Sequence, residues 1–425
     1  MKTDSFIIKG DICYSPDKNT MLAFKDHYLI CLDGHSAGVF EFLPDEYAQL
    51  ELYDYSGLLV IPGLVDLHTH APQFTLRGLG MDDELLDWLN NLTFPEESKY
   101  SNLEYARAAY TDFAQAMKYG ATTRACIFGT VHLPATIMLM EYMEETGLGT
   151  FVGKVNMDRN CPEYIAENTE TSAAETEKWV KLCTSLGFEN TRPILTPRFI
   201  PTCSDELMRK LRVIQEKYEL PLQSHLSENP AEIELVSELC KEAEFYGDAY
   251  DRFELFGRDV PTIMAHCVHS GEKELARIRE NGVFIAHCPQ SNTNLASGIA
   301  PVRKFLDMGL RCGLGSDVAG SASESMFRAM ADAIQMSKMR WRLLDRELRP
   351  LTFEEAFFMA TKGGGEFFGR VGSFEKGYEF DAVIIDDNLP VYRACLSLKQ
   401  RLERHTYISG GHDAAHKFVR GKQIF

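Results

Sequence analysis

Two histidines one residue apart, His68 and His70, end the apolar run Leu-Val-Ile-Pro-Gly-Leu-Val-Asp-Leu. The composition of this run is typical of a β-strand. Side chains at i and i+2 of a strand point to the same face, so both imidazoles can reach one point in space. Imidazole is a common ligand of zinc and similar metals. The pair thus has the chemistry of half a metal site, although an isolated His-x-His also occurs among surface and core histidines.

Further side chains with metal-binding or catalytic chemistry end other apolar segments. His225, His266, His287 and Asp317 stand at such ends, and Arg198 follows one more segment. Each of them alone could be a core or capping residue. Imidazole and carboxylate are, however, the ligands of hydrolytic metal sites. The pattern predicts such a site if the fold brings the ends of these segments together.

The segments that carry these residues alternate with helical patterns through the middle of the chain. We predict eight strands, at Leu58–Leu67, Ala121–Phe128, Thr150–Asn156, Pro193–Thr196, Pro221–His225, Pro261–His266, Gly282–His287 and Leu310–Gly315. Helical patterns lie between them at Leu103–Tyr119, Glu170–Leu186, Ser204–Tyr218, Ala231–Ala243 and Glu272–Asn281. This alternation predicts an α/β protein with a (β/α)8 TIM barrel, in which functional residues lie at the carboxyl ends of the strands. An open doubly wound sheet is the alternative, but its G-x-G-x-x-G fingerprint is missing from the expected place.

Both ends of the chain are rich in short β-like segments. They include Ser5–Lys9, Met21–Phe24 and Tyr28–Leu32 near the start, and Phe380–Ile385 and a hairpin pattern over 417–425 near the end. Turn residues separate these segments, as in antiparallel sheets. We therefore predict a small β-sandwich domain formed by residues 1–63 and 376–425, beside a barrel of metal-dependent hydrolase type over residues 64–375.

Composition excludes several classes of partner. The chain has 425 residues and a formal net charge of −18, which would repel a nucleic-acid backbone or an anionic membrane. Its eleven cysteines include no C-x-x-C pair, which is typical of thiols in a reducing compartment. No apolar signal core opens the chain, and no apolar run is long enough to span a bilayer. We expect a cytoplasmic protein that acts on a small molecule.

The order His-x-His, His225, His266 and Asp317 resembles the amidohydrolase superfamily, in its branch of single-metal purine and pyrimidine deaminases. Within this branch the chain is most similar to the guanine deaminases. The similar segments are His-Thr-His-Ala-Pro-Gln at 68–73, Thr-Phe-Pro-Glu-Glu at 93–97, Gly-Lys-Val-Asn-Met-Asp at 153–158, Thr-Pro-Arg-Phe at 196–199 and His-Leu-Ser-Glu-Asn at 225–229. Related deaminases of larger purines usually lack a glutamine at the place of Gln73, so Gln73 and Arg198 are the discriminating pair.

The resemblance implies that one divalent metal is held by His68, His70, His225 and Asp317. Two-metal members bridge their ions with a modified lysine at the end of the fourth strand, and no lysine lies in 193–199. Zinc suits three nitrogens and one carboxylate, and iron stays an alternative on ligand type. The resemblance also suggests a homodimer.

The activity implied is the conversion of guanine to xanthine and ammonia. Metal-bound hydroxide attacks C2, while Glu228 moves the proton of the water to ring nitrogen N3. Asp317 and His266 orient the water and relay a proton to the leaving amino group, and which of the two carries that proton stays open. A structural role for Glu228, as a charge at a helix N-terminus, is the alternative.

Substrate recognition is expected from Gln73, Arg198 and Phe199, with His70 and His225 also bordering the substrate. Arg198 can donate to the carbonyl O6, and Gln73 offers a donor and an acceptor. The alternatives are a surface ion pair for Arg198 and plain core packing for Phe199.

Some histidines and two other functions stay open. His132 and His269 are expected to have structural roles, and His287 is unassigned. A sister aminohydrolase acting on another purine, cytosine or a triazine would keep the metal and Glu228. A non-catalytic barrel that serves as a scaffold is the alternative from another class, although no expected ligand is missing.

Overall fold

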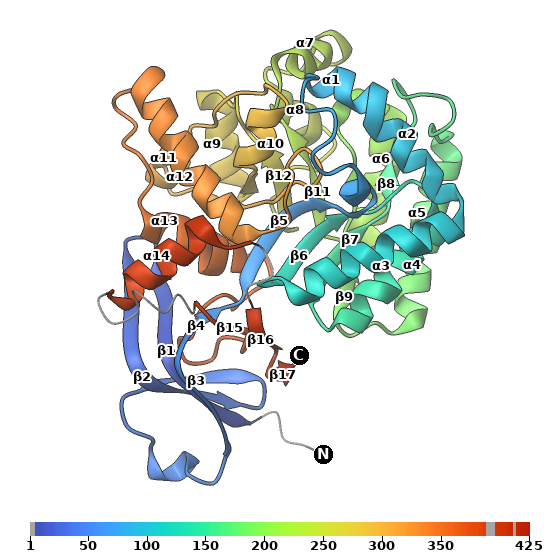
Figure 1. The fold of residues 1–425 in the computed structure, drawn as a ribbon. Helices are drawn as coiled ribbons and strands as arrows, with labels where there is room; N and C mark the ends of the chain where they lie inside the picture. The colour runs from blue at the N-terminus through green and yellow to red at the C-terminus, as the bar shows by residue number, and fades with distance from the viewer. Residues whose placement is uncertain (1–4, 388–395, 411–413) are drawn as a thin grey trace.

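A barrel of parallel strands ringed by helices makes up most of the molecule (Figure 1). The structure is a computed structural model that describes residues 5–387, 396–410 and 414–425. One four-stranded parallel sheet contains β5 (Leu64–His70), β6 (Thr122–Phe128), β7 (Gly149–Gly153) and β9 (Thr191–Pro193). A second contains β11 (Leu222–Leu226), β12 (Thr262–His266), β13 (Phe284–His287) and β14 (Arg311–Leu314).

The two sheets close into a ring. A parallel bridge joins Leu195 to Leu222, beside the short pair β8 (Val155–Asn156) and β10 (Thr196–Pro197). On the other side, the backbone N–H of Asp317 donates to the carbonyl of His68 at 2.8 Å. The predicted (β/α)8 barrel is therefore confirmed, and its closing hydrogen bond joins two of the predicted metal ligands.

Three predicted strands are interrupted in the structure. The segment Leu58–Leu67 was expected as one strand, but it divides at Gly63 into β4 (Glu51–Pro62) and β5. A Cβ on Gly63 would lie 2.0 Å from Oγ1 of Thr123, so only glycine allows this close approach. The other two predicted strands, at 150–156 and 193–196, break into β7 with β8 and β9 with β10.

Helices pack around the barrel. α3 (Leu103–Tyr119) and α9 (Glu272–Asn281) have the predicted bounds, and α5 (Thr169–Leu186) and α6 (Asp205–Tyr218) differ from prediction by one residue. α7 (Pro230–Leu239) ends earlier than predicted, because Cys240 leaves the helical conformation with φ −123° and ψ 64°. The capping box of Thr352 and Glu355, predicted before a helix at 356–361, starts α13 (Phe353–Phe358). The helices not predicted are α1 (Leu85–Trp88), α2 (Phe94–Ser98), α4 (Leu133–Thr146), α8 (Tyr246–Asp251), α10 (Pro289–Asn294), α11 (Val302–Asp307), α12 (Met326–Leu343) and α14 (Leu398–Ile408).

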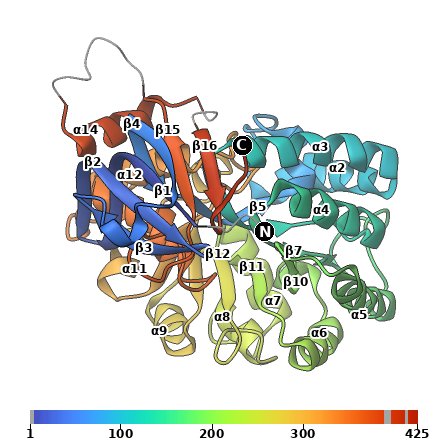
Figure 2. The ribbon, with the colours of Figure 1, turned by 90° about the horizontal axis from the view of Figure 1, so that it is seen from below.

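Strands from both ends of the chain lie side by side in a second structural unit (Figure 2). Its sheet has the order β17-β16-β15-β4-β1-β2-β3. The new strands are β1 (Phe6–Asp17), β2 (Thr20–Leu32), β3 (His35–Phe40), β15 (Ala382–Ile385), β16 (Ala414–Val419) and β17 (Lys422–Gln423). The small β unit built from both termini is thus as predicted, with its strands joined in one continuous sheet. The segments 21–24 and 28–32, expected as two strands, belong to the single strand β2.

The two faces of this sheet bury different cores. Phe6, Ile8 and Phe418 belong to a separate apolar cluster. Residues of the opposite face, such as Ile61 and Val383, belong to the large core that the barrel shares with its helices. The sheet is therefore packed against the barrel by apolar contact. No helix in the described part of the chain is long and apolar enough to cross a membrane.

Candidate active site

The four predicted metal ligands meet at the carboxyl ends of β5, β11 and β14. The Nε2 atoms of His68 and His70 are 3.2 Å apart, and those of His70 and His225 are 3.3 Å apart. Oδ1 of Asp317 lies 3.2 Å from Nε2 of His68 and 3.5 Å from Nε2 of His70. Ligand atoms at zinc bond lengths of about 2.0–2.1 Å in a tetrahedron are about 3.4 Å apart. The spacing of these buried donors therefore fits one metal ion.

Hydrogen bonds behind the ligands hold them in this orientation. Nδ1 of His225 contacts the backbone carbonyl of Arg198 at 2.6 Å, so this nitrogen donates and Nε2 faces the centre of the site. The carboxylate of Asp66 accepts from the backbone N–H groups of His68 and Ser316 at 3.1 and 2.9 Å. Burial raises the pKa of Asp66 to about 6. Asp66 thereby connects His68 to Ser316, the residue that precedes Asp317.

Glu228 and His266 form the second part of the site. Oε2 of Glu228 lies 3.3 Å from Nε2 of His266, which is 3.7 Å from Oδ2 of Asp317. Burial, and the nearby charge of Asp317, raise the pKa of Glu228 well above its ordinary value. Nδ1 of His266 contacts Oδ1 of Asn292 at 2.8 Å, and Ser297 donates to Oε1 of Glu228 at 3.2 Å. This carboxyl group is therefore suited to hold and release a proton.

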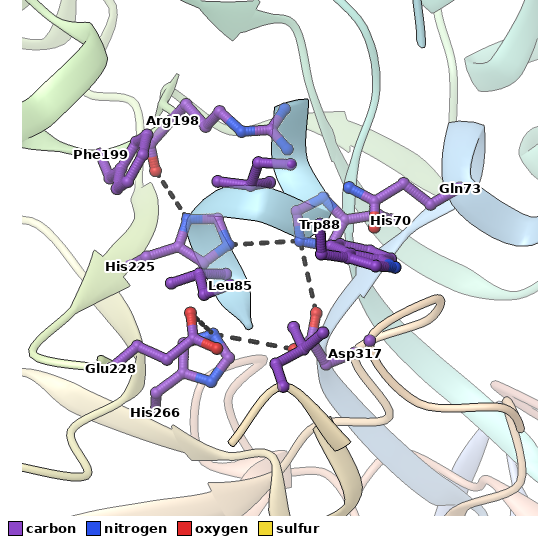
Figure 3. A pocket seen from close by; sticks show the side chains of 13 residues that line it. His70, Gln73, Leu85, Trp88, Arg198, Phe199, His225, Glu228, His266 and Asp317 are labelled. Atoms are coloured by element: carbon purple, nitrogen blue, oxygen red, sulfur yellow. Dashed lines mark hydrogen bonds and ion pairs between the residues drawn. The ribbon is translucent and has the colours of Figure 1, made fainter. Parts of the chain in front are cut away.

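Gln73 and Arg198 lie on the opposite side of the site. Figure 3 shows them in the upper part of the view and Glu228 with His266 in the lower part, with His70 and His225, two of the predicted metal ligands, between them. Nε2 of Gln73 donates to Glu97 at 2.8 Å, and Nη1 of Arg198 donates to the same carboxylate at 2.7 Å. Arg198 is 2% exposed, so its predicted alternative as a surface ion pair is wrong.

A pocket joins the two sides. Its lining includes Gln73, Arg198, Phe199, Glu228 and Asp317. Apolar side chains complete the walls; they are Leu85, Trp88, Leu89 and Leu295. Apolar walls with polar groups at two ends suit a planar heterocycle.

The other singled-out histidines lie outside this pocket. His287 is buried at the end of β13 and is not among the lining residues. Nε2 of His269 contacts the carbonyl of Ser297 at 2.7 Å, which supports the structural role expected for it. His132 precedes α4 and borders a separate groove.

Comparison with known proteins identifies the family. The model of the Amidohydrolase family matches residues 59–423. The chain belongs to this family. The amidohydrolase is 37% identical to a guanine deaminase of Dictyostelium discoideum over 94% of this chain and 88% of that protein. It is 35% identical to the guanine deaminase of Escherichia coli strain K12 over 79% of this chain and 75% of that protein.

Solved structures of guanine deaminases are also similar to this amidohydrolase. The crystal structure of a guanine deaminase from C. acetobutylicum, with guanine bound in its active site, is 45% identical. It superposes with a TM-score of 0.96 over 99% of this chain and 100% of that chain. The E. coli guanine deaminase is 29% identical, with a TM-score of 0.88 over 99% of both chains.

The sequence did not predict the apolar cover of the pocket or the role of Glu97. Leu85, Trp88 and Leu89 come from α1 and the π-helical turn that follows it. These turns are too short to show a helical period. Glu97 belongs to the segment Thr-Phe-Pro-Glu-Glu, which carried the family resemblance without a role for its glutamates.

Proposed function

We propose that this amidohydrolase is a guanine deaminase, which converts guanine and water to xanthine and ammonia. The observation that carries the proposal is that one pocket has groups for substrate recognition at one end and groups for proton transfer at the opposite end. Gln73 and Arg198 offer donors and an acceptor at one end, and Glu228 and His266 offer proton transfer at the other. The similarity to a protein with guanine bound in its active site, over nearly the whole chain, supports the same substrate.

We assign one divalent ion, zinc, to His68, His70, His225 and Asp317. The donor set supports this assignment, since three imidazoles and one carboxylate match a hydrolytic zinc site with room for water. His68 belongs to two groups whose donor atoms lie within 4.8 Å of one another, one with His70 and His225 and one that includes Asp317. When bound there, the ion acts as a Lewis acid that lowers the pKa of water from about 15.7 toward 7.

The edge of guanine that carries O6 faces Arg198 and Gln73. The planar guanidinium donates to the carbonyl O6, and the amide of Gln73 pairs with a neighbouring ring position. Phe199, His70 and His225 border the ring, because all three line the pocket. This pose turns C2 and N3 toward Glu228 and His266.

Proton transfer then takes place at the end of the pocket formed by Glu228 and His266. Glu228 takes the proton that water gives up and delivers it to N3, which makes C2 electrophilic. The water oxygen bonds to C2 to form a tetrahedral intermediate. Asp317 and His266 orient the water and pass its second proton to the 2-amino group. The C–N bond breaks, and ammonia and xanthine leave.

The test of this function compares purines that differ at one position. Purified protein supplied with zinc should form xanthine and one ammonia from each guanine. 2,6-Diaminopurine carries the same 2-amino group, but its 6-amino group cannot accept from Arg198. Its kcat/KM should be lower by about a hundredfold or more, because a buried donor is left unpaired. Guanine left unreacted, or faster release of ammonia from 2,6-diaminopurine, cytosine or a triazine, would contradict the proposal.

Removal of the Arg198 side chain should weaken substrate binding. Arg198→Ala is expected to raise the KM for guanine by about 10- to 100-fold, since a charged hydrogen bond is lost. Bound metal should be unchanged, because His225 contacts the backbone carbonyl of Arg198 and not its side chain. Steady-state kinetics and elemental analysis on the same preparation check both statements. An unchanged KM would remove Arg198 from the substrate edge.

We also propose a homodimer located in the cytoplasm, and a division of the chain into a terminal β domain of residues 1–63 and 376–425 and a barrel of residues 64–375. The family resemblance supports the first two points, and the separate apolar cluster of the terminal sheet supports the third. Light scattering should give twice the 48.1 kDa of one chain.

A further inference from the structure

Glu97 connects Gln73 and Arg198, the two residues expected to face the O6 edge of the substrate, without lining the pocket itself. It lies on the short helix α2 and is 1% exposed. Its Oε1 accepts from Nε2 of Gln73 at 2.8 Å, and its Oε2 accepts from Nη1 of Arg198 at 2.7 Å. The pocket lining includes Gln73 and Arg198 but not Glu97. Glu97 therefore acts on a substrate through these two side chains.

The contact with Glu97 determines which end of the Gln73 amide faces which group. Oε1 of Gln73 accepts from the backbone N–H of Ala319 at 3.2 Å, while Nε2 donates to Glu97. A flipped amide would place its oxygen against the carboxylate and its NH2 group against the N–H of Ala319. Both contacts would be repulsive, because each puts like partners together. Gln73 thus presents one free N–H and one free lone pair at fixed positions.

The same carboxylate balances the charge of Arg198. The guanidinium is buried, and it lies 5.2 Å from the ring centroid of Phe94, on the same helix as Glu97. Within the described residues its ion pair is the one with Glu97. An unpaired buried charge is costly and attracts an opposite charge. Because Arg198 and Glu97 form an ion pair, this end of the pocket offers N–H donors but carries almost no net charge.

We propose that Glu97 is a positioning residue that adapts the substrate edge to a neutral purine carbonyl and disfavours the acidic product. The inference rests on the proposed function. Replacement of the 2-amino group of guanine by a carbonyl makes the purine more acidic, so xanthine forms an anion more readily than guanine does. An uncompensated Arg198 would retain that anion. The Glu97 carboxylate prevents this retention and so favours product release.

The experiment compares two ligands that share the 6-oxo edge and differ in charge. Hypoxanthine is neutral at mildly alkaline pH, whereas xanthine is partly ionised. Dissociation constants of both are measured as competitive inhibition or by calorimetry, for the unaltered protein, Glu97→Gln, Glu97→Asp and the control Glu96→Gln. Glu96 is the matched control because its carboxylate accepts from Thr75 and Lys99, both at 2.6 Å, and not from Gln73 or Arg198.

In Glu97→Gln we expect weaker hypoxanthine binding, by about tenfold, and xanthine binding that is unchanged or tighter. The dissociation constant of hypoxanthine divided by that of xanthine should therefore rise by about tenfold. Glu97→Asp keeps the charge on a shorter side chain, so it should weaken both ligands without shifting the ratio. The ratio should stay unshifted in Glu96→Gln. Metal content and melting temperature of each variant are measured on the same samples.

The outcomes separate this inference from the proposed function. If the unaltered protein does not form xanthine from guanine, the proposed function fails. If it does and Glu97→Gln leaves the ratio unchanged, only the role of Glu97 is overturned. If Glu97→Gln does not fold, Glu97→Asp decides the positioning role, and equal binding of both ligands by Glu97→Asp and the unaltered protein would overturn it.

Discussion

Glu228→Gln is expected to lower kcat for guanine by about 10²- to 10⁴-fold, the usual loss when a proton-transfer group is removed. Glutamine has nearly the same shape and can still accept the hydrogen bond that Ser297 donates at 3.2 Å. It cannot take a proton from water and deliver it to N3. The KM for guanine and the bound metal should therefore stay close to those of the unaltered protein. Steady-state kinetics with elemental analysis measure all three quantities.

A matched control tests whether the loss belongs to this carboxyl group. Glu234 lies on α7, the helix that follows Glu228, and is exposed. Glu234→Gln makes the same chemical change near the same helix end, and it should retain full activity. Full activity in Glu228→Gln would instead remove Glu228 from the mechanism. A loss of metal in Glu228→Gln would mean that this residue supports the metal site and that its kinetic effect is indirect.

Asp317→Asn is expected to remove both bound metal and turnover. Oδ1 of Asp317 lies 3.2 and 3.5 Å from two imidazole nitrogens, so its charge offsets that of the cation. Loss of groups that merely support ligands costs about 10- to 100-fold in metal affinity. Loss of a ligand charge should exceed this, and activity should fall below detection at limiting zinc. Zinc titration followed by calorimetry and by xanthine formation checks both effects.

The same titration shows whether the metal stabilises the fold. A ligand that binds only the native state raises the free energy of unfolding with its concentration. The melting temperature of the unaltered protein should rise with zinc, and that of Asp317→Asn should rise much less. Asp307→Asn, at an exposed aspartate, is the control and should behave like the unaltered protein. Equal zinc affinity in Asp317→Asn and the unaltered protein would exclude Asp317 as a ligand.

Much of the barrel could be predicted because its strands and several of its long helices have their own local pattern. α3 is an example, since its apolar face repeats with the helical period and its bounds were predicted to the residue. α4 was not predicted, because its sequence Leu-Pro-Ala-Thr-Ile-Met-Leu-Met is apolar on nearly all sides and lacks a clear period. The division at Gly63 was not predicted either, because a local strand pattern does not say which sheet a strand joins.

The candidate site was predictable to the extent that strand ends determine it. His68 and His225 lie near the carboxyl ends of their strands and Asp317 follows one, and the carboxyl ends of parallel strands meet at one face of a barrel. The substrate edge depends instead on contacts between distant parts of the chain. Glu97 reaches Arg198 across 101 residues, and no spacing rule connects them. Residue type and order therefore indicated the metal and proton chemistry, but the pairing that adjusts the substrate edge required the three-dimensional structure.

The central claim is that one metal ion, held by four distant side chains, enables the deamination of guanine. The most direct test removes metal with a chelator, adds zinc back stepwise and measures xanthine formed from guanine at each step. We expect activity to be absent without metal, to rise in proportion to added zinc and to reach its maximum at one ion per chain. Full activity in the metal-free protein, or a fully loaded protein that leaves guanine unreacted, would contradict it.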